Sequence, residues 1–254
     1  MTLDPLDADM VIEAQTAACN TLQSHDIAYM VLIGPDKHSI YPEHLPLSCR
    51  LGQGPSMLDQ IFSVMAENQL PFSDPRAALM AAKETAPTDL YWHTDTHWNE
   101  LGGWVAYNHL MDSLAPIVPA LHRVQAEDFT ATPCDFSGDL AGMIGMAGIY
   151  VEKTMTCAFH DEAQIQVDGS LCNEMFTVYR NHALPEGPTV VLRHDSFGEA
   201  IIPFLARSAG LLYTTTSEEL PLPAILEAQA DLVLVEYVER DALGLGNVIS
   251  EEEW

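Results

Sequence analysis

The chain alternates short apolar runs with segments of helical periodicity, and this alternation constrains its fold more than any other feature. Four runs are typical of strands: IAYMVLI at 27–33, TVVLRH at 189–194, LLYTT at 211–215 and DLVLVEY at 231–237. Helical patterns lie between them, at 8–24, 55–68, 75–85, 100–114, 199–209 and 219–229. Continuous apolar strands are buried on both faces. The pattern therefore predicts an α/β three-layer sandwich with a mainly parallel sheet.

A chain of 254 residues, 48% of them hydrophobic, is long enough to bury one substantial core. It contains no internal repeat, low-complexity tract or Gly/Ser linker that would mark a domain boundary. We therefore predict a single domain over residues 1–254. The segment at about 120–185 is less regular, and we interpret it as a long insertion or a small β excursion.

The charge and the cysteines exclude several classes of function. Ten basic residues against 37 acidic ones give a formal net charge of −27, which repels phosphate backbones and anionic lipid. Nucleic acid is therefore not an expected partner. The five cysteines are odd in number and include no CxxC pair, which excludes the usual zinc and redox motifs. The sequence has no apolar run of membrane-spanning length, and its first ten residues are acidic where a signal peptide would be basic.

A turn after the 189–194 strand presents a candidate nucleophile. In the stretch TVVLRHDSFGEAIIPFLARSAG, a buried strand leads into Ser196 and Gly198 and then into an apolar segment. A strand, turn and helix in this order typically present a nucleophilic serine at the edge of a sheet. If the helix begins near residue 200, Ser196 lies at its N-terminus, where free N–H groups stabilise a developing oxyanion. The alternative is that Asp195 or Ser196 simply caps the helix.

The stretch TDTHWN, residues 94–99, supplies a base for this serine. Asp95 and His97 are two residues apart, so in an extended segment both side chains point the same way. A histidine can take the serine proton while a carboxylate fixes its tautomer and stabilises the imidazolium. Asn99 suits the cap of the following helix, and two glycines in the first turn of that helix indicate close approach of another backbone segment.

Together these motifs resemble a known family. The chain contains DTHWN..G, then DSFG about a hundred residues later, with PDK..IYPE.LP upstream and DLVLVEYVER near its end. It is similar in these motifs to SGNH-hydrolase-like proteins of the alginate O-acetyltransferase type, over about residues 27–240. The resemblance implies Ser196 as nucleophile, His97 as base and Asp95 as its orienting acid. It also implies a periplasmic location, whereas a chain that is complete as written, without an export signal, would be cytoplasmic.

The resemblance implies a polysaccharide O-acetyltransferase that forms an acyl-enzyme. Its partners would be an acetyl donor, a polysaccharide acceptor and proteins of a polysaccharide export system; no cofactor and no metal are expected. We expect Asn99, Tyr41, Lys37 and Trp98 to contact the substrate. Because the net charge opposes an acceptor as anionic as alginate, an uncharged glycan is expected, unless a basic patch reverses the local field. That patch would consist of Arg180, Arg193 and Arg207.

Three other functions are compatible with the same residues. Water in place of the sugar acceptor would make the protein an esterase for carbohydrate or small esters. His93, Asp95 and His97 alternate along the chain and together provide the ligand set of a non-haem iron site. A protein that binds glycan without catalysis is the third alternative, and the presence of all three residue types of a triad argues against it.

Overall fold

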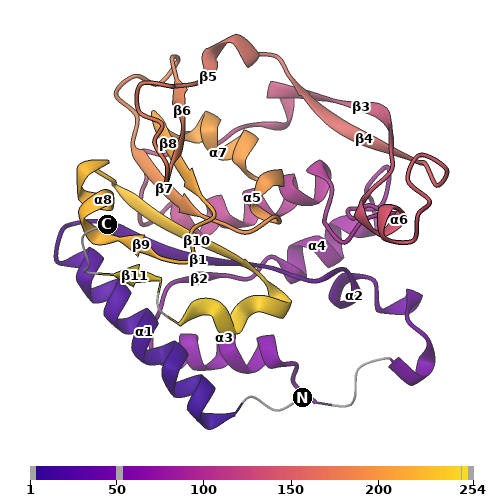
Figure 1. Ribbon diagram of the computed structural model, residues 1–254, viewed down its shortest axis with the longest axis horizontal. Coiled ribbons are helices and arrows are strands. Elements are labelled where there is room, and N and C mark those ends of the chain that lie inside the picture. Colours follow the sequence, from indigo (N-terminus) through magenta and orange to yellow (C-terminus); the bar gives the residue numbers. More distant parts are fainter. Residues whose placement is uncertain (1–3, 50–53, 247, 251–254) are drawn as a thin grey trace.

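The computed structural model describes residues 4–49, 54–246 and 248–250. A seven-stranded sheet crosses the molecule, and its first five strands are parallel (Figure 1). The last two strands are antiparallel to their neighbours. In spatial order the strands are β2 (Phe72–Ser73), β1 (Ala28–Gly34), β10 (Leu232–Val238), β7 (Thr189–Arg193), β8 (Leu211–Thr215), β6 (Thr177–Asn181) and β5 (Ile165–Val167).

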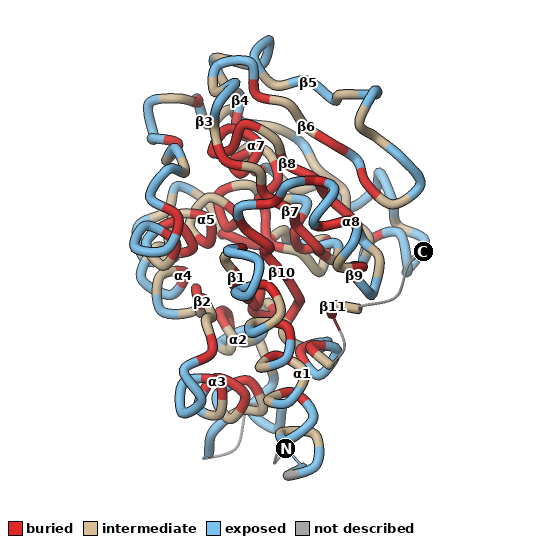
Figure 2. The backbone as a smooth tube through the Cα atoms, turned by 90° about the vertical axis from the view of Figure 1, so that its left-hand side faces the viewer, coloured by how far each residue is buried: buried red, intermediate tan, exposed pale blue. Residues whose placement is uncertain are grey.

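Helices cover both faces of this sheet because successive strand residues point to opposite sides. Met30 and Leu32 of β1 pack in one core and Val31 and Ile33 in the other. The first core lies under α4 (Arg76–Lys83), α5 (Glu100–Leu114) and α7 (Ile202–Ser208). The second lies under α1 (Pro5–Gln23), α3 (Met57–Glu67) and α8 (Leu222–Glu227). The predicted three-layer α/β sandwich is confirmed, and Figure 2 shows buried residues concentrated in the central strands.

The segment predicted as irregular, 120–185, contains more regular structure than expected. Strands β3 (Phe129–Phe136) and β4 (Glu152–Phe159) form a separate antiparallel hairpin, and the short helix α6 (Asp139–Met143) lies between them in the chain. Strands β5 and β6, which follow, join the main sheet. The remaining elements are the helix α2 (Lys37–Ile40) and a small sheet of β9 (Leu220–Pro221) and β11 (Ile249–Ser250).

The helix expected at 199–209 is divided. A 3₁₀ turn, Gly198–Ala200, comes first, and α7 begins only at Ile202, with Pro203 in its first turn. Proline is tolerated there because the first N–H groups of a helix have no intrahelical acceptor. Ser196 therefore lies in a turn that precedes the α-helix, and not at the N-terminus of the helix as expected.

Strands β1, β10 and β7 are adjacent and parallel, so their carboxyl ends meet at one edge of the sheet. Helix α5 brings the Asp-His segment to the same edge. A Cβ atom at Gly102 would overlap the carbonyl of Leu90, and one at Gly103 would lie 2.6 Å from the carbonyl oxygen of Ala200. The close approach expected from these glycines is present. No helix within the described ranges is both long and apolar enough to span a bilayer.

Candidate active site

Ser196, His97 and Asp95 form a continuous hydrogen-bonded chain. The His97 Nε2 atom lies 2.7 Å from Ser196 Oγ, and His97 Nδ1 lies 2.5 Å from Asp95 Oδ1. With the proton on Nδ1 donated to the carboxylate, Nε2 is free to accept the serine hydroxyl proton. Ser196 is exposed, whereas the side chain of Asp95 is only 10% exposed. The two halves of this site are 99 residues apart in sequence.

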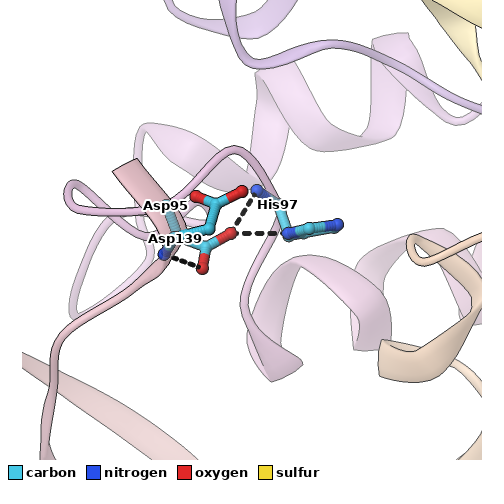
Figure 3. Close-up of side chains that lie close together, drawn as sticks. All are labelled: Asp95, His97 and Asp139. Atoms are coloured by element: carbon cyan, nitrogen blue, oxygen red, sulfur yellow. Dashed lines mark hydrogen bonds and ion pairs between the residues drawn. The ribbon is translucent and has the colours of Figure 1, made fainter. Parts of the chain in front are cut away.

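The Asp95 carboxylate is held by three N–H donors (Figure 3). The His97 ring and the backbone N–H of His97 donate to Oδ1, and the backbone N–H of Asp139 donates to Oδ2 at 2.9 Å. Burial raises the pKa of Asp95, but these hydrogen bonds outweigh it, so the pKa lies below the usual value of an aspartate. Asp95 is therefore ionised at neutral pH, as an orienting carboxylate must be.

The β3–β4 hairpin supports the Asp-His segment from outside the sheet. Asp139 accepts hydrogen bonds from the backbone N–H and the hydroxyl of Thr96. Glu152 accepts hydrogen bonds from the backbone N–H and the hydroxyl of Thr94. A Cβ atom at Gly138 would overlap the side chain of Asp95, so only glycine lets the hairpin approach this closely.

These hairpin residues were not predicted. Neither their spacing nor their local pattern differs from that of an ordinary polar loop, because their partners lie more than 40 residues away in sequence. The short sequence SGD at 137–139, a glycine and a carboxylate in a turn, is the only local signal.

Lys37 also holds the Asp-His segment through hydrogen bonds to its backbone. Its ammonium group donates to the carbonyl oxygen of Trp92 at 2.5 Å and to that of Asp95. Burial lowers the pKa of Lys37 despite the neighbouring carboxylates, which raise it. Lys37 was expected to contact the substrate; it lines the cavity beside His97, but these two bonds direct its ammonium group to the loop.

Two of the expected substrate contacts are wrong. Trp98 is 1% exposed and its indole N–H donates to the carbonyl of Phe197, so it belongs to the core. Asn99 is also 1% exposed; its oxygen caps α5 through Leu101 and Gly102, and its amide donates to a loop carbonyl. Both residues follow His97 within two positions, but the chain turns inward after it.

Tyr41 is 5% exposed, and its hydroxyl accepts a hydrogen bond from the backbone N–H of Leu90 at 2.9 Å. Its ring lines the cavity. A substrate contact through that ring stays a prediction.

A cavity of about 760 Å³ opens beside His97. This volume is in the range of sites for small molecules and sugar units. Histidines, aspartates, tyrosines and a few aliphatic side chains line it: Asp36, Lys37, His38, Tyr41, His44, Leu45, Asp89, Tyr91, His93, Thr96, His97, Asp139, Leu140, Met143 and Arg240.

The metal alternative required His93, Asp95 and His97 to converge, and the structure does not bring them together. The His93 side chain is 67% exposed and its Nε2 atom contacts Asp89 at 2.5 Å. Asp139 takes its place near Asp95 and His97, with candidate ligand atoms of the three residues within 4.8 Å of one another. Both oxygens of Asp139 already accept hydrogen bonds from Thr96, which is the arrangement of a structural loop.

The fold and the serine–histidine–aspartate geometry together define an SGNH-hydrolase-like protein. A family model confirms this class: residues 7–169 match the family described as SGNH hydrolase-like domain, acetyltransferase AlgX, and the chain belongs to that family. The matched span includes Asp95 and His97 and ends before Ser196. No curated protein matches the chain by sequence.

Solved structures show the same fold at low sequence identity. A DHHW family protein from Eubacterium siraeum is 14% identical, with a TM-score of 0.69 over 95% of this chain and 90% of that one. PatB1 of Bacillus cereus, solved with a sulfonyl adduct, is 16% identical, with a TM-score of 0.69 over 92% and 90%. The O-acetyltransferase domain of Pseudomonas putida AlgJ is 18% identical, with a TM-score of 0.60 over 97% and 86%.

Proposed function

We propose that the protein is a polysaccharide O-acetyltransferase that works through an acetyl-enzyme on Ser196. The family, and the O-acetyltransferase domain of AlgJ among its structural neighbours, support the reaction class. The observation that carries the mechanism is the 2.7 Å contact between Ser196 Oγ and His97 Nε2, with ionised Asp95 behind the imidazole. An exposed serine with its base already in contact is arranged for nucleophilic catalysis.

The reaction has two acyl-transfer steps. Ser196 Oγ attacks the acetyl carbonyl of the donor while His97 Nε2 takes its proton, and the intermediate collapses as the leaving group receives that proton. A sugar hydroxyl then gives its proton to Nε2 and attacks the acetyl-serine, and Ser196 Oγ leaves and is reprotonated. The backbone N–H of Ser196 donates no hydrogen bond to any described residue, so it is available to stabilise the oxyanion.

An uncharged glycan fits the site better than an anionic one. The basic patch considered from sequence is not at the cavity: Arg180 and Arg207 pair with aspartates, and Arg193 is buried and donates to backbone carbonyls. The cations that line the cavity are Lys37, which binds carbonyls, and Arg240, which pairs with an aspartate. The net charge of −27 repels anions at long range, and no unpaired lysine or arginine among the described cavity-lining residues offsets that repulsion.

The proposal extends to a periplasmic site of action, where an acetyl donor and proteins of a polysaccharide export system would be its partners. Fractionation of cells that express the natural gene, with a cytoplasmic marker enzyme as reference, tests the location. Recovery of the protein with the cytoplasmic marker would contradict it.

Hydrolysis of p-nitrophenyl acetate tests the mechanism. We expect slow hydrolysis by the wild type, faster turnover when an uncharged oligosaccharide is added, and an acetyl group on Ser196 in intact-protein mass spectra. Ser196→Ala and His97→Ala should each lose several powers of ten in rate, because the triad acts as a unit. Ser63→Ala, an exposed serine on α3, is the matched control and should match the wild type.

Three outcomes would change the proposal. Ser196→Ala protein that hydrolyses the ester at the wild-type rate would show that the serine is not the nucleophile. A rate unchanged by every glycan acceptor would favour the esterase alternative, since the same acetyl-enzyme is then discharged only by water. Acceleration by an anionic oligosaccharide over an uncharged one at low salt would contradict the predicted acceptor charge.

A further inference from the structure

A carboxyl group lies completely buried directly beneath the serine turn. Glu236 is on β10, in the middle of the main sheet, and is 0% exposed. Glutamate is rarely buried without a partner, because transfer of its charge out of water is very unfavourable. The triad does not use this side chain, so its position calls for another explanation.

The carboxyl group of Glu236 contacts the chain that carries the nucleophile. Its Oε2 atom accepts a hydrogen bond from the backbone N–H of Asp195 at 3.2 Å. The other oxygen, Oε1, has no hydrogen-bond partner among the described residues. A Cβ atom at Gly34 would lie 3.2 Å from that oxygen and 3.0 Å from the ring of Phe197, so a larger side chain there would crowd both.

The surroundings favour the neutral form of Glu236. Burial raises its pKa well above the usual value, and the Asp195 carboxylate raises it further. Arg193 lowers it, but the guanidinium group donates hydrogen bonds to the backbone carbonyls of Ser217 and Glu236 and not to the Glu236 carboxyl group. The Asp195 carboxylate is bound to backbone N–H groups of Phe197 and Val238.

We propose that Glu236 is a positioning residue, which as a neutral carboxylic acid accepts the Asp195 backbone N–H and fixes the turn that carries Ser196. The inference rests on the proposed function of that serine. Several hydrogen bonds hold the turn. Asp195 N–H to Glu236 and Val238 N–H to the Asp195 side chain join it to β10, and Phe197 N–H to the Asp195 side chain and Gly198 N–H to the Asp195 carbonyl lie within it. Of the two bonds that reach β10, only the first involves the backbone of Asp195, the residue immediately before the nucleophile.

Two substitutions separate the positioning role from simple burial. Glu236→Gln keeps the shape and an accepting oxygen without the titrating proton, and we expect its kcat for p-nitrophenyl acetate to stay within about threefold of the wild type. Glu236→Leu removes the acceptor, and we expect kcat to fall about tenfold to hundredfold with KM within about twofold, because small displacements of a catalytic group are costly. Thr154→Val, at another buried side chain with an unpartnered oxygen, is the control and should keep the wild-type kcat.

Infrared spectroscopy tests the protonation state independently. The wild type at neutral pH should show the band of a protonated carboxyl group, and Glu236→Gln should lack it. Absence of that band from the wild type, or a loss of kcat in the Gln variant as large as in the Leu variant, would overturn the proposal. So would a Leu variant with the wild-type kcat.

Failure of the proposed function is distinguishable from failure of this inference. It would appear in Ser196→Ala, whose ester hydrolysis would then equal that of the wild type. Amide hydrogen exchange at Asp195 remains a direct readout in that case. We expect faster exchange in Glu236→Leu than in Glu236→Gln, and equal rates in the two variants would contradict the assigned hydrogen bond.

Discussion

A single methyl group at Gly138 should disable the Asp-His half of the site without replacement of a triad residue. Gly138 has an extended backbone (φ −94°), so alanine meets no conformational penalty there. Its Cβ atom would overlap the Asp95 side chain, which forces the hairpin away and breaks the 2.9 Å hydrogen bond from Asp139 N–H to Asp95. A hydrogen bond to a charged group contributes about 1.5–3 kcal/mol, so kcat should fall about tenfold to a hundredfold.

The assay is steady-state hydrolysis of p-nitrophenyl acetate by Gly138→Ala beside Gly142→Ala. Gly142 lies four residues further on, in α6, where a Cβ atom would meet nothing within 4 Å. We expect the Gly142 variant to retain the wild-type kcat and a slightly higher stability, since alanine favours a helix over glycine. A Gly138 variant with wild-type kcat, or equal losses in both variants, would refute the assignment of the hairpin as a support for Asp95.

Three further predictions concern residues around the site. Lys37→Met should lower kcat about tenfold or more with little change in KM, because the ammonium group holds the loop carbonyls of Trp92 and Asp95; Lys37→Arg, which keeps donors, should recover part of the rate. Asn99→Ala should lower the free energy of unfolding in urea by about 1–2 kcal/mol through loss of the helix cap, with the acceptor KM unchanged. Glu236→Gln should gain stability over the wild type as pH rises above about 4.3, by about 1.4 kcal/mol per pH unit until the folded pKa is reached. The reason is that burial raises the folded pKa, so the unfolded chain releases a proton that the folded wild type retains; urea midpoints that move in parallel from about pH 5 to about pH 8 would contradict it.

Local pattern was sufficient to predict four adjacent strands of the main sheet, β1, β10, β7 and β8, but not β2, β5 or β6. Residues 211–215 and 100–114 were predicted with the bounds that the structure has, because an apolar run and a capped helix are signals contained within the segment itself. The pairing of the DTHW and DSFG motifs was argued from the need of a nucleophilic serine for a base and from the family resemblance, and their 2.7 Å contact could not be calculated from spacing. A distance between residues 99 positions apart depends on the order of the strands, which the sequence does not encode locally.

The two expected substrate contacts that proved wrong, Trp98 and Asn99, share one physical cause. A position next to a catalytic residue does not determine the face to which a side chain points. Trp98 follows His97 directly, but the chain enters α5 there and the indole turns into the core. Glu236 could have been noticed from sequence alone, as the one carboxylate within the apolar run LVLVEYV. Its role could not be predicted, because the backbone N–H that it accepts belongs to Asp195, which follows a different strand, β7.

The carboxyl groups of Asp95 and Glu236 have opposite protonation states, and the number of hydrogen-bond donors to each group determines its state. Asp95 is mostly buried but accepts three N–H hydrogen bonds, which stabilise its charge more than burial destabilises it. Glu236 is fully buried and accepts only one, so desolvation prevails and the proton stays. In the proposed mechanism the ionised carboxylate would suit the imidazolium that forms, and the neutral one would place no second charge beneath the serine oxyanion. Removal of a donor would therefore raise the pKa of Asp95, and addition of a donor would lower the pKa of Glu236. Each change would favour the protonation state that does not suit its end of the site.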